Sequence, residues 1–252
     1  MTRQLVHRHH IFAFCCYAVL MGSAWGEDPP SRPAALTPEV QTAEWAKAWW
    51  MPRHEQKLAE KAGMEQIDLV WIGDSITHGW EESGKPIWEQ YYVPRHAFNL
   101  GFSGDRTEQV LWRLQHGELD GVTPKLVVIM IGTNNAGHRQ DPAEQTAAGV
   151  QAIINELRQR VPDSKILLLA IFPRGAEPDD PLRKLNDATN KLLAAMADQK
   201  QIFYADIGAA FLDQDGRLPA SIMPDFLHPN ADGYAIWAAR LEPVLKPLLG
   251  ES

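Results

Sequence analysis

The chain has 252 residues, of which 45% are hydrophobic and 22% are charged, and its formal net charge is −8 at pH 7. This composition suits one compact domain with a sizeable core and excludes a disordered or fibrous chain. An acidic surface repels phosphate backbones and anionic membranes, so the charge argues against nucleic acid as a partner.

Residues 1–26 have the composition of an export signal. Arginines and histidines precede an apolar run over residues 11–21, and small residues follow it up to Gly26. A basic region, a short apolar region and small residues, in that order, are typical of a cleavable signal peptide, and the apolar run is too short to span a bilayer. We therefore predict a secreted or periplasmic protein without a membrane span. Cleavage after Gly26 removes two arginines and no acidic residue, which makes the net charge −10.

Cysteine chemistry is excluded from the mature chain. Cys15 and Cys16 both lie in the predicted signal peptide, so no disulfide, thiolate nucleophile or zinc–cysteine site remains after cleavage. Residues 27–38, rich in Pro, Ser and Ala, are predicted to form a flexible lead-in. Residues 39–250 are predicted to form a single domain.

The first predicted helix runs from about residue 38 to residue 61, with an interruption at Pro52. Trp45 and Trp49 are four residues apart and share one face of such a helix. We interpret this pair as core packing against the sheet, because tryptophans at helical spacing usually bury. The functional alternative is an aromatic lid or a carbohydrate platform.

Beyond residue 66, short apolar runs alternate with longer amphipathic segments. Strands are predicted over residues 69–72, 97–100, 126–131, 166–171 and 202–205, and helices over residues 87–92, 106–116, 142–160, 181–197 and 231–249. Strands that alternate with helices form βαβ units, so the fold class is α/β, with a mostly parallel sheet covered by helices on both faces.

Three polar or glycine-containing turns follow three different predicted strands, at Ser75, Gly104 and Asn134. In parallel sheets ligands bind beyond the carboxyl ends of the strands, so these turns are expected to meet at one edge of the sheet. Ser75 lies where a buried strand turns into a helix, beside backbone N–H groups that have no partner within the helix. This turn is the candidate centre of the site.

A serine hydroxyl needs a base to act as a nucleophile, usually a histidine held in one tautomer by a carboxylate. Asp225 and His228 are three residues apart, so the carboxylate can accept from Nδ1 and leave Nε2 free for the proton of Ser75. Asp232 is the competing carboxylate, but we expect it in the following helix. Donors for an oxyanion are the N–H groups of Ser75 and Gly104 and the side-chain amide of Asn134.

Other residues near these turns leave alternatives open. Gly101 and Gly104 can exchange the roles of tight-turn glycine and oxyanion donor. Asp105 can be a catalytic acid, but we interpret it as the cap of the helix that follows. Arg174 can meet an acidic group of a substrate or pair with an acid such as Asp105. Asn135, next to Asn134, is an alternative candidate for the side-chain oxyanion donor. The sequence has no P-loop and no dinucleotide-binding glycine pattern.

The blocks IGDSIT, NLGFSGDRT, GTNN and DFLHPNADGY, in this order and spacing, resemble the SGNH (GDSL) hydrolase superfamily. Three further segments are similar to its branch that contains the catalytic subunits of intracellular platelet-activating-factor acetylhydrolase: WMPRHEQK, VLWRLQHGEL and FPRGAEPDDPLRKLNDATN. The resemblance extends from about Trp49 to Leu245, which is nearly the whole predicted mature chain.

The resemblance implies a flavodoxin-like three-layer α/β/α sandwich with a mostly parallel five-stranded sheet. It also implies serine esterase activity that needs no metal or other cofactor. The residues it implies are Ser75 as nucleophile, Asp225 and His228 as the rest of the triad, Ser75, Gly104 and Asn134 as the oxyanion hole, and Asp74 in a supporting role. The choice of Asn134 over Asn135 follows from the family position.

We therefore expect an exported serine esterase that removes small O-acyl groups, above all acetyl, from a glycan or another small molecule. A phospholipid deacetylase or lysophospholipase is the enzymatic alternative. An alternative from another class is a non-catalytic glycan-binding protein that keeps the fold. The resemblance permits a homodimer.

Overall fold

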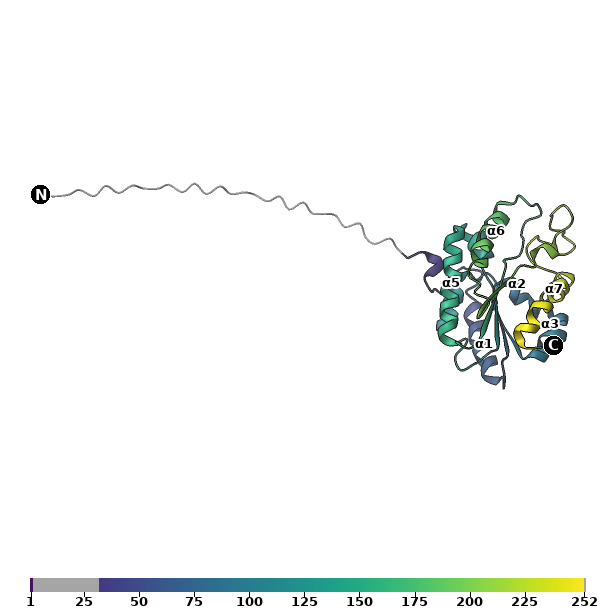
Figure 1. Ribbon diagram of the computed structural model, residues 1–252, viewed down its shortest axis with the longest axis horizontal. Coiled ribbons are helices and arrows are strands. Elements are labelled where there is room, and N and C mark those ends of the chain that lie inside the picture. Colours follow the sequence, from purple (N-terminus) through teal and green to yellow (C-terminus); the bar gives the residue numbers. More distant parts are fainter. Residues whose placement is uncertain (2–31, 252) are drawn as a thin grey trace. The chain divides into compact units, whose positions relative to one another are not determined.

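The computed structural model describes Met1 and residues 32–251 (Figure 1). The predicted signal peptide, Met1 apart, and the first part of the predicted lead-in lie outside the described residues. Among the described helices, none combines the length and the apolar character that crossing a bilayer requires.

Five parallel strands form the sheet, in the spatial order β2-β1-β3-β4-β5. They are β1 Leu69–Gly73, β2 Ala97–Gly101, β3 Leu126–Met130, β4 Lys165–Leu169 and β5 Ile202–Ala205. This is the flavodoxin-like order, so the predicted α/β fold is confirmed. The order reverses on either side of β1, which pairs with β2 on one side and β3 on the other. The carboxyl end of β1 is therefore the expected position of a ligand site.

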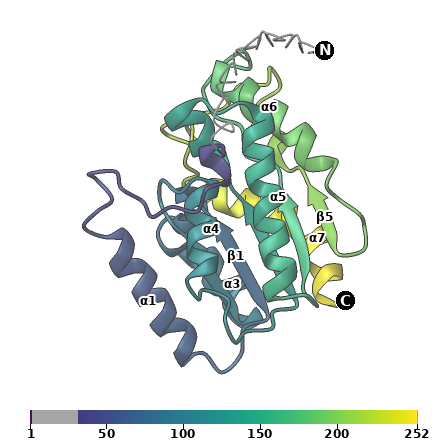
Figure 2. The same ribbon diagram turned by 90° about the vertical axis from the view of Figure 1, so that its left-hand side faces the viewer.

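Helices cover both faces of the sheet. They are α1 Trp50–Gly63, α2 Ser75–His78, α3 Lys85–Tyr91, α4 Thr107–Gln115, α5 Ala143–Arg160, α6 Pro181–Ala194 and α7 Ala231–Leu249. Figure 1 shows α5 and α6 on one face of the sheet and α3 and α7 on the other, and Figure 2 shows α4 and α5 from the front. The sheet separates two hydrophobic cores, one on each face. Because alternate strand residues point to opposite faces, Ile72 of β1 packs in one core and Trp71 in the other.

The segment before α1 differs from the prediction. Residues 44–49 form turns, α1 begins only at Trp50, and Pro52 lies in its first turn, where a proline is tolerated. Trp45 is 53% exposed, so its interpretation as a core residue is wrong. The buried anchor of this segment is Ala46, which packs with Trp50 and Phe102 in a small separate core.

The described end of the predicted flexible lead-in is packed against the domain. Ala34–Leu36 form a 3₁₀ turn in which Ala35 is fully buried. The carbonyl of Ala35 accepts a hydrogen bond from the Thr107 hydroxyl at 2.9 Å. A Cβ on Gly149 of α5 would lie 2.7 Å from the same carbonyl, so this glycine allows the close approach.

Candidate active site

Ser75 is the first residue of α2 and directly follows β1 and Asp74. The side chain of Asp74 caps the helix by accepting the N–H of Ile76 at 3.0 Å. The N–H of Ser75 makes no hydrogen bond within the described part of the chain. A first-turn N–H group lacks a partner inside its helix, so this one is available to a ligand.

Ser75, His228 and Asp225 form a chain of hydrogen bonds. Ser75 Oγ lies 2.8 Å from His228 Nε2, and His228 Nδ1 lies 2.6 Å from Asp225 Oδ2. The other carboxylate oxygen of Asp225 accepts the backbone N–H groups of His228 and Leu227 at 2.8 and 3.1 Å, which fixes its orientation. Asp232 lies in α7 and makes no such bond within residues 32–251. A hydroxyl, an imidazole and a carboxylate linked in this order can activate the hydroxyl as a nucleophile.

The two acidic side chains beside Ser75 have opposite pKa shifts. Partial burial alone would raise the pKa of Asp225, but the hydrogen bonds from the ring and backbone of His228 hold it below its usual value. Asp225 is thus a carboxylate that can orient the imidazole. Complete burial raises the pKa of Asp74 to about 6, although the hydrogen bond from the N–H of Ile76 and the nearby charges of His228 and Arg174 act to lower it.

The turn after β2 presents a free N–H at Gly104. Gly104 has φ +77°, and its N–H makes no hydrogen bond to the described residues. The N–H of Gly101, in contrast, donates to Asn99 Oδ1 at 2.8 Å, and a Cβ on Gly101 would lie 2.1 Å from the backbone nitrogen of His78. Gly101 therefore permits close packing against α2, whereas the backbone N–H of Gly104 is available to donate to a ligand.

The adjacent asparagines after β3 have different partners. Asn134 Nδ2 donates to the carbonyl of Asp105 at 3.0 Å, which uses one of its two amide hydrogens. Asn135 is fully buried and fully engaged: its Oδ1 accepts the N–H of Thr107, and its Nδ2 donates to Thr107 Oγ1 and Asp141 Oδ2. The second amide hydrogen of Asn134 is therefore available to donate to a ligand.

A cavity of about 240 Å³ opens beside Ser75 and His228. Its lining residues are Ser75, His78, Gly79, Glu82, Ser83, Ser103, His228, Pro229 and Tyr234. The hydroxyl of Tyr234, on α7, donates to the carbonyl of Ile76 at 2.7 Å and links this helix to α2. Most of the lining is polar or small, so the cavity offers little apolar surface to a long alkyl chain.

The model of the GDSL-like lipase/acylhydrolase family matches residues 71–236. The chain belongs to this family. It is 37% identical to the platelet-activating factor acetylhydrolase IB subunit alpha1 of Pongo abelii, over 89% of this chain and 93% of the relative. As an acylhydrolase of the GDSL type, it is an ester hydrolase.

Two solved structures share the fold. A GDSL-like lipase from Bacteroides thetaiotaomicron has a TM-score of 0.60 at 21% identity, over 77% of this chain and 97% of that one. The acetylxylan esterase Axe2 from Geobacillus stearothermophilus has a TM-score of 0.57 at 22% identity, over 75% of this chain and 98% of that one. At this identity the likeness concerns the architecture, the SGNH hydrolase fold.

Asp105 of this GDSL-type hydrolase differs from the expectation, and one of the two alternatives for Arg174 is excluded. Asp105 is not the helix cap, because α4 begins after Arg106 and Asp105 is fully buried. Its carboxylate accepts from Trp50 Nε1 at 2.7 Å and from Arg113 Nε at 2.8 Å. Arg174 does not pair with Asp105. Its guanidinium donates to the carbonyl and hydroxyl of Thr133 at 2.8 and 3.1 Å, which secures the turn that carries Asn134.

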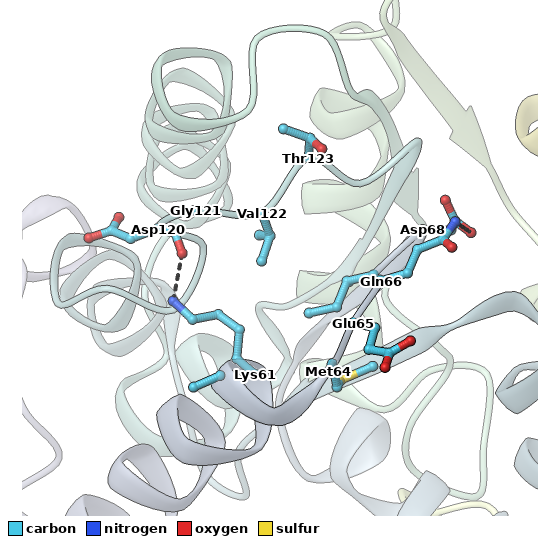
Figure 3. Close-up of a pocket in the computed structure, with 11 residues that line it drawn as sticks. Lys61, Met64, Glu65, Gln66, Asp68, Asp120, Gly121, Val122 and Thr123 are labelled. Atoms are coloured by element: carbon cyan, nitrogen blue, oxygen red, sulfur yellow. Dashed lines mark hydrogen bonds between the residues drawn. The ribbon is translucent and has the colours of Figure 1, made fainter.

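A larger cavity, of about 540 Å³, lies at the amino ends of β1 and β3 (Figure 3). In it Lys61 Nζ donates to the carbonyl of Asp120 at 2.8 Å. No residue predicted for the hydrolase site lines this cavity, and the carboxyl ends of the strands face the opposite way. The larger volume is therefore no guide to the chemistry of this family member.

Sequence reasoning missed His78 and Ser103, which line the cavity beside Ser75. The signal that identifies His78 is its position three residues after Ser75, since residues i and i+3 share one face of a helix.

Proposed function

We propose that this protein is an exported serine esterase that removes small O-acyl groups, above all acetyl, through an acyl-enzyme. The observation that supports it best is the pair of hydrogen bonds from Ser75 to His228 and from His228 to Asp225, at 2.8 and 2.6 Å. The export part of the proposal rests on the composition of residues 1–26.

In the first half of the reaction, Ser75 Oγ attacks the ester carbonyl as His228 Nε2 takes the hydroxyl proton. Asp225 stabilises the resulting imidazolium. The tetrahedral intermediate collapses when His228 returns the proton to the leaving alcohol, which leaves the acyl group on Ser75. His228 then deprotonates a water molecule that attacks the acyl-enzyme, and it returns this proton to Ser75 Oγ as the acid leaves.

The negative charge on the tetrahedral intermediate needs preorganised donors. The free N–H groups of Ser75 and Gly104 and the remaining amide hydrogen of Asn134 are suited to this role. Because Asn134 also donates to the carbonyl of Asp105, the turns after β2 and β3 are tied together. We assign Asp74 a supporting role, because its carboxyl caps the helix that begins at Ser75.

For the alcohol part of the ester, we propose a glycan or another small molecule. The small volume of the cavity beside Ser75, about 240 Å³, and the polar side chains in its lining support this choice. A phospholipid deacetylase or lysophospholipase is the second candidate, favoured by the 37% identity to a platelet-activating factor acetylhydrolase subunit. A non-catalytic glycan-binding role has less support, since it gives no reason for the hydrogen-bonded triad.

Replacement of Ser75 tests the proposal. Ser75→Ala should lower kcat for 4-nitrophenyl acetate by about 10⁵-fold, because the triad acts as a unit. Ser221→Ala, at an exposed serine, is the matched control and should keep wild-type turnover. Circular dichroism of both variants checks that they fold. A folded Ser75→Ala protein with wild-type turnover would exclude Ser75 as the nucleophile.

A further inference from the structure

An aromatic surface made by Trp45 and Trp49 adjoins the candidate site. The indole of Trp45 is 53% exposed, yet the turns around it are well anchored. The N–H groups of Ala46 and Lys47 donate to the carbonyl of Ala43, and Trp49 Nε1 donates to the carbonyl of Trp45 at 3.1 Å. A large apolar ring is thus held toward solvent by the fold, which needs an explanation.

The indole of Trp45 lies directly against Gly104. A Cβ on Gly104 would lie 2.0 Å from Trp45 Cη2, so the two residues are in contact. Gln41 strengthens this arrangement, because its Nε2 donates to the carbonyl of Gly104 at 3.3 Å and its Oε1 accepts the N–H of Ala43. The tryptophan therefore borders the proposed oxyanion donor.

Polar groups continue the surface toward Ser75. The rings of Trp45 and Trp49 have centroids 6.2 Å apart, and Trp49 lies 6.1 Å from the ring of His78. His78 Nδ1 is 3.0 Å from Ser103 Oγ, and both residues line the cavity that contains Ser75. Burial and the charge of Arg53 lower the pKa of His78 to about 4, so its ring is neutral near pH 7 and offers both a donor and an acceptor.

We propose that Trp45 and Trp49, with His78 and Ser103, bind the sugar ring of an O-acetylated carbohydrate whose acetyl group is presented to Ser75. This inference rests on the proposed esterase function and names its substrate class. A pyranose has a face of C–H groups that packs on the electron-rich face of an indole, and hydroxyls at its edge that hydrogen-bond. An aromatic ring next to neutral polar groups matches both features.

The same surface does not match a phospholipid. A lipid tail needs a continuous apolar wall, whereas the lining of the cavity that contains Ser75 includes His78, Ser103 and Glu82. The carboxylate of Glu82 also repels a phosphate group, in a chain whose net charge is already negative. A sugar carries neither a tail nor a charge, so it fits without these penalties.

The test compares acetylated xylooligosaccharides with 4-nitrophenyl acetate. In Trp45→Leu the ratio of kcat/KM for the sugar to that for the aryl ester should fall about tenfold, through a higher KM for the sugar, because an aromatic face is lost while apolar bulk remains. Trp45→Phe should retain most of the ratio. Leu192→Ala, at an exposed apolar residue of α6, is the control and should leave the ratio unchanged.

Several outcomes would overturn the inference. One is a wild-type enzyme that cleaves 4-nitrophenyl acetate but no acetylated sugar, which leaves the esterase function standing. Another is equal ratios for Trp45→Leu and Trp45→Phe, since simple apolar contact then suffices. A third is a loss of dimerisation in Trp45→Leu with an unchanged ratio, which would assign the surface to a second copy of the chain. A wild type inactive on both esters would instead reject the proposed function itself.

Discussion

At the scale of single residues, Asn134 and Asn135 carry the same amide group but differ in the number of partners they hold. Asn134 has one hydrogen bond, to the carbonyl of Asp105, and Asn135 holds Thr107 and Asp141 together through both ends of its amide. A buried amide whose hydrogens are all bonded within the protein stabilises the fold but has no hydrogen left to donate to a substrate. The pair should therefore separate catalysis from stability.

Asn134→Ala should lower kcat for 4-nitrophenyl acetate by about 10²- to 10³-fold, as removal of an oxyanion donor does. Asn135→Ala should instead destabilise the fold by about 2 to 3 kcal/mol, since it leaves the buried N–H of Thr107 without a partner and removes one hydrogen bond each from Thr107 Oγ1 and Asp141 Oδ2. Steady-state kinetics and urea denaturation of both variants make the comparison. An unchanged kcat in Asn134→Ala removes this residue from the oxyanion hole.

Short spacing made one contact of the candidate site predictable from the sequence alone. Asp225 and His228 share one turn of chain, so their contact follows from local geometry. Asp105 was misinterpreted because its partners, Trp50 and Arg113, are 55 and 8 positions away and the contact with Trp50 depends on where α1 begins. Trp45 was misinterpreted for a related reason, because the helix that was expected to bury it does not include it.

At the scale of elements, α2 has only four residues, too few to be stable alone. It is held by neighbours: Asp74 caps it, and the hydroxyl of Tyr234 donates to the carbonyl of Ile76. The strands were predictable to within two residues because most of their residues are buried and they read as short, mainly apolar runs. The turns before α1 were not, because Ala46 anchors them through contacts with Trp50 and Phe102.

Tyr234→Phe should weaken the support of α2 while keeping the aromatic packing. The lost bond to a carbonyl should lower the free energy of unfolding by about 1 kcal/mol. Because Ser75 begins α2, kcat should also fall several-fold. Tyr91→Phe is the matched control, since the Tyr91 hydroxyl makes no hydrogen bond to the described residues, and it should change neither quantity. Equal stability and kcat in both variants would show that the Tyr234 bond does not support α2.

At the scale of the whole molecule, the site depends on the complete fold, since Ser75 and His228 are 153 positions apart. The strand order could be anticipated from the resemblance but not from the pattern of strands, because alternation of strands and helices does not specify which strands are neighbours. Burial of Asp74 follows from the same assembly. It directly follows β1, which lies between β2 and β3 in the sheet, and only the tertiary structure excludes water there.

The buried carboxyl of Asp74 should make the stability of the fold depend on pH. Its pKa rises from 3.8 to about 6 on folding, so between these values the folded state holds a proton that the unfolded state has lost. This contribution makes the fold less stable as pH rises from about 4 to 6, by about 3 kcal/mol in total, and then levels off. Asp74→Asn keeps the acceptor for the N–H of Ile76 and lacks the ionisation. Urea denaturation from pH 4 to 7 should therefore show the variant gaining stability over the wild type as pH rises, and parallel profiles would mean that Asp74 does not titrate differently in the two states.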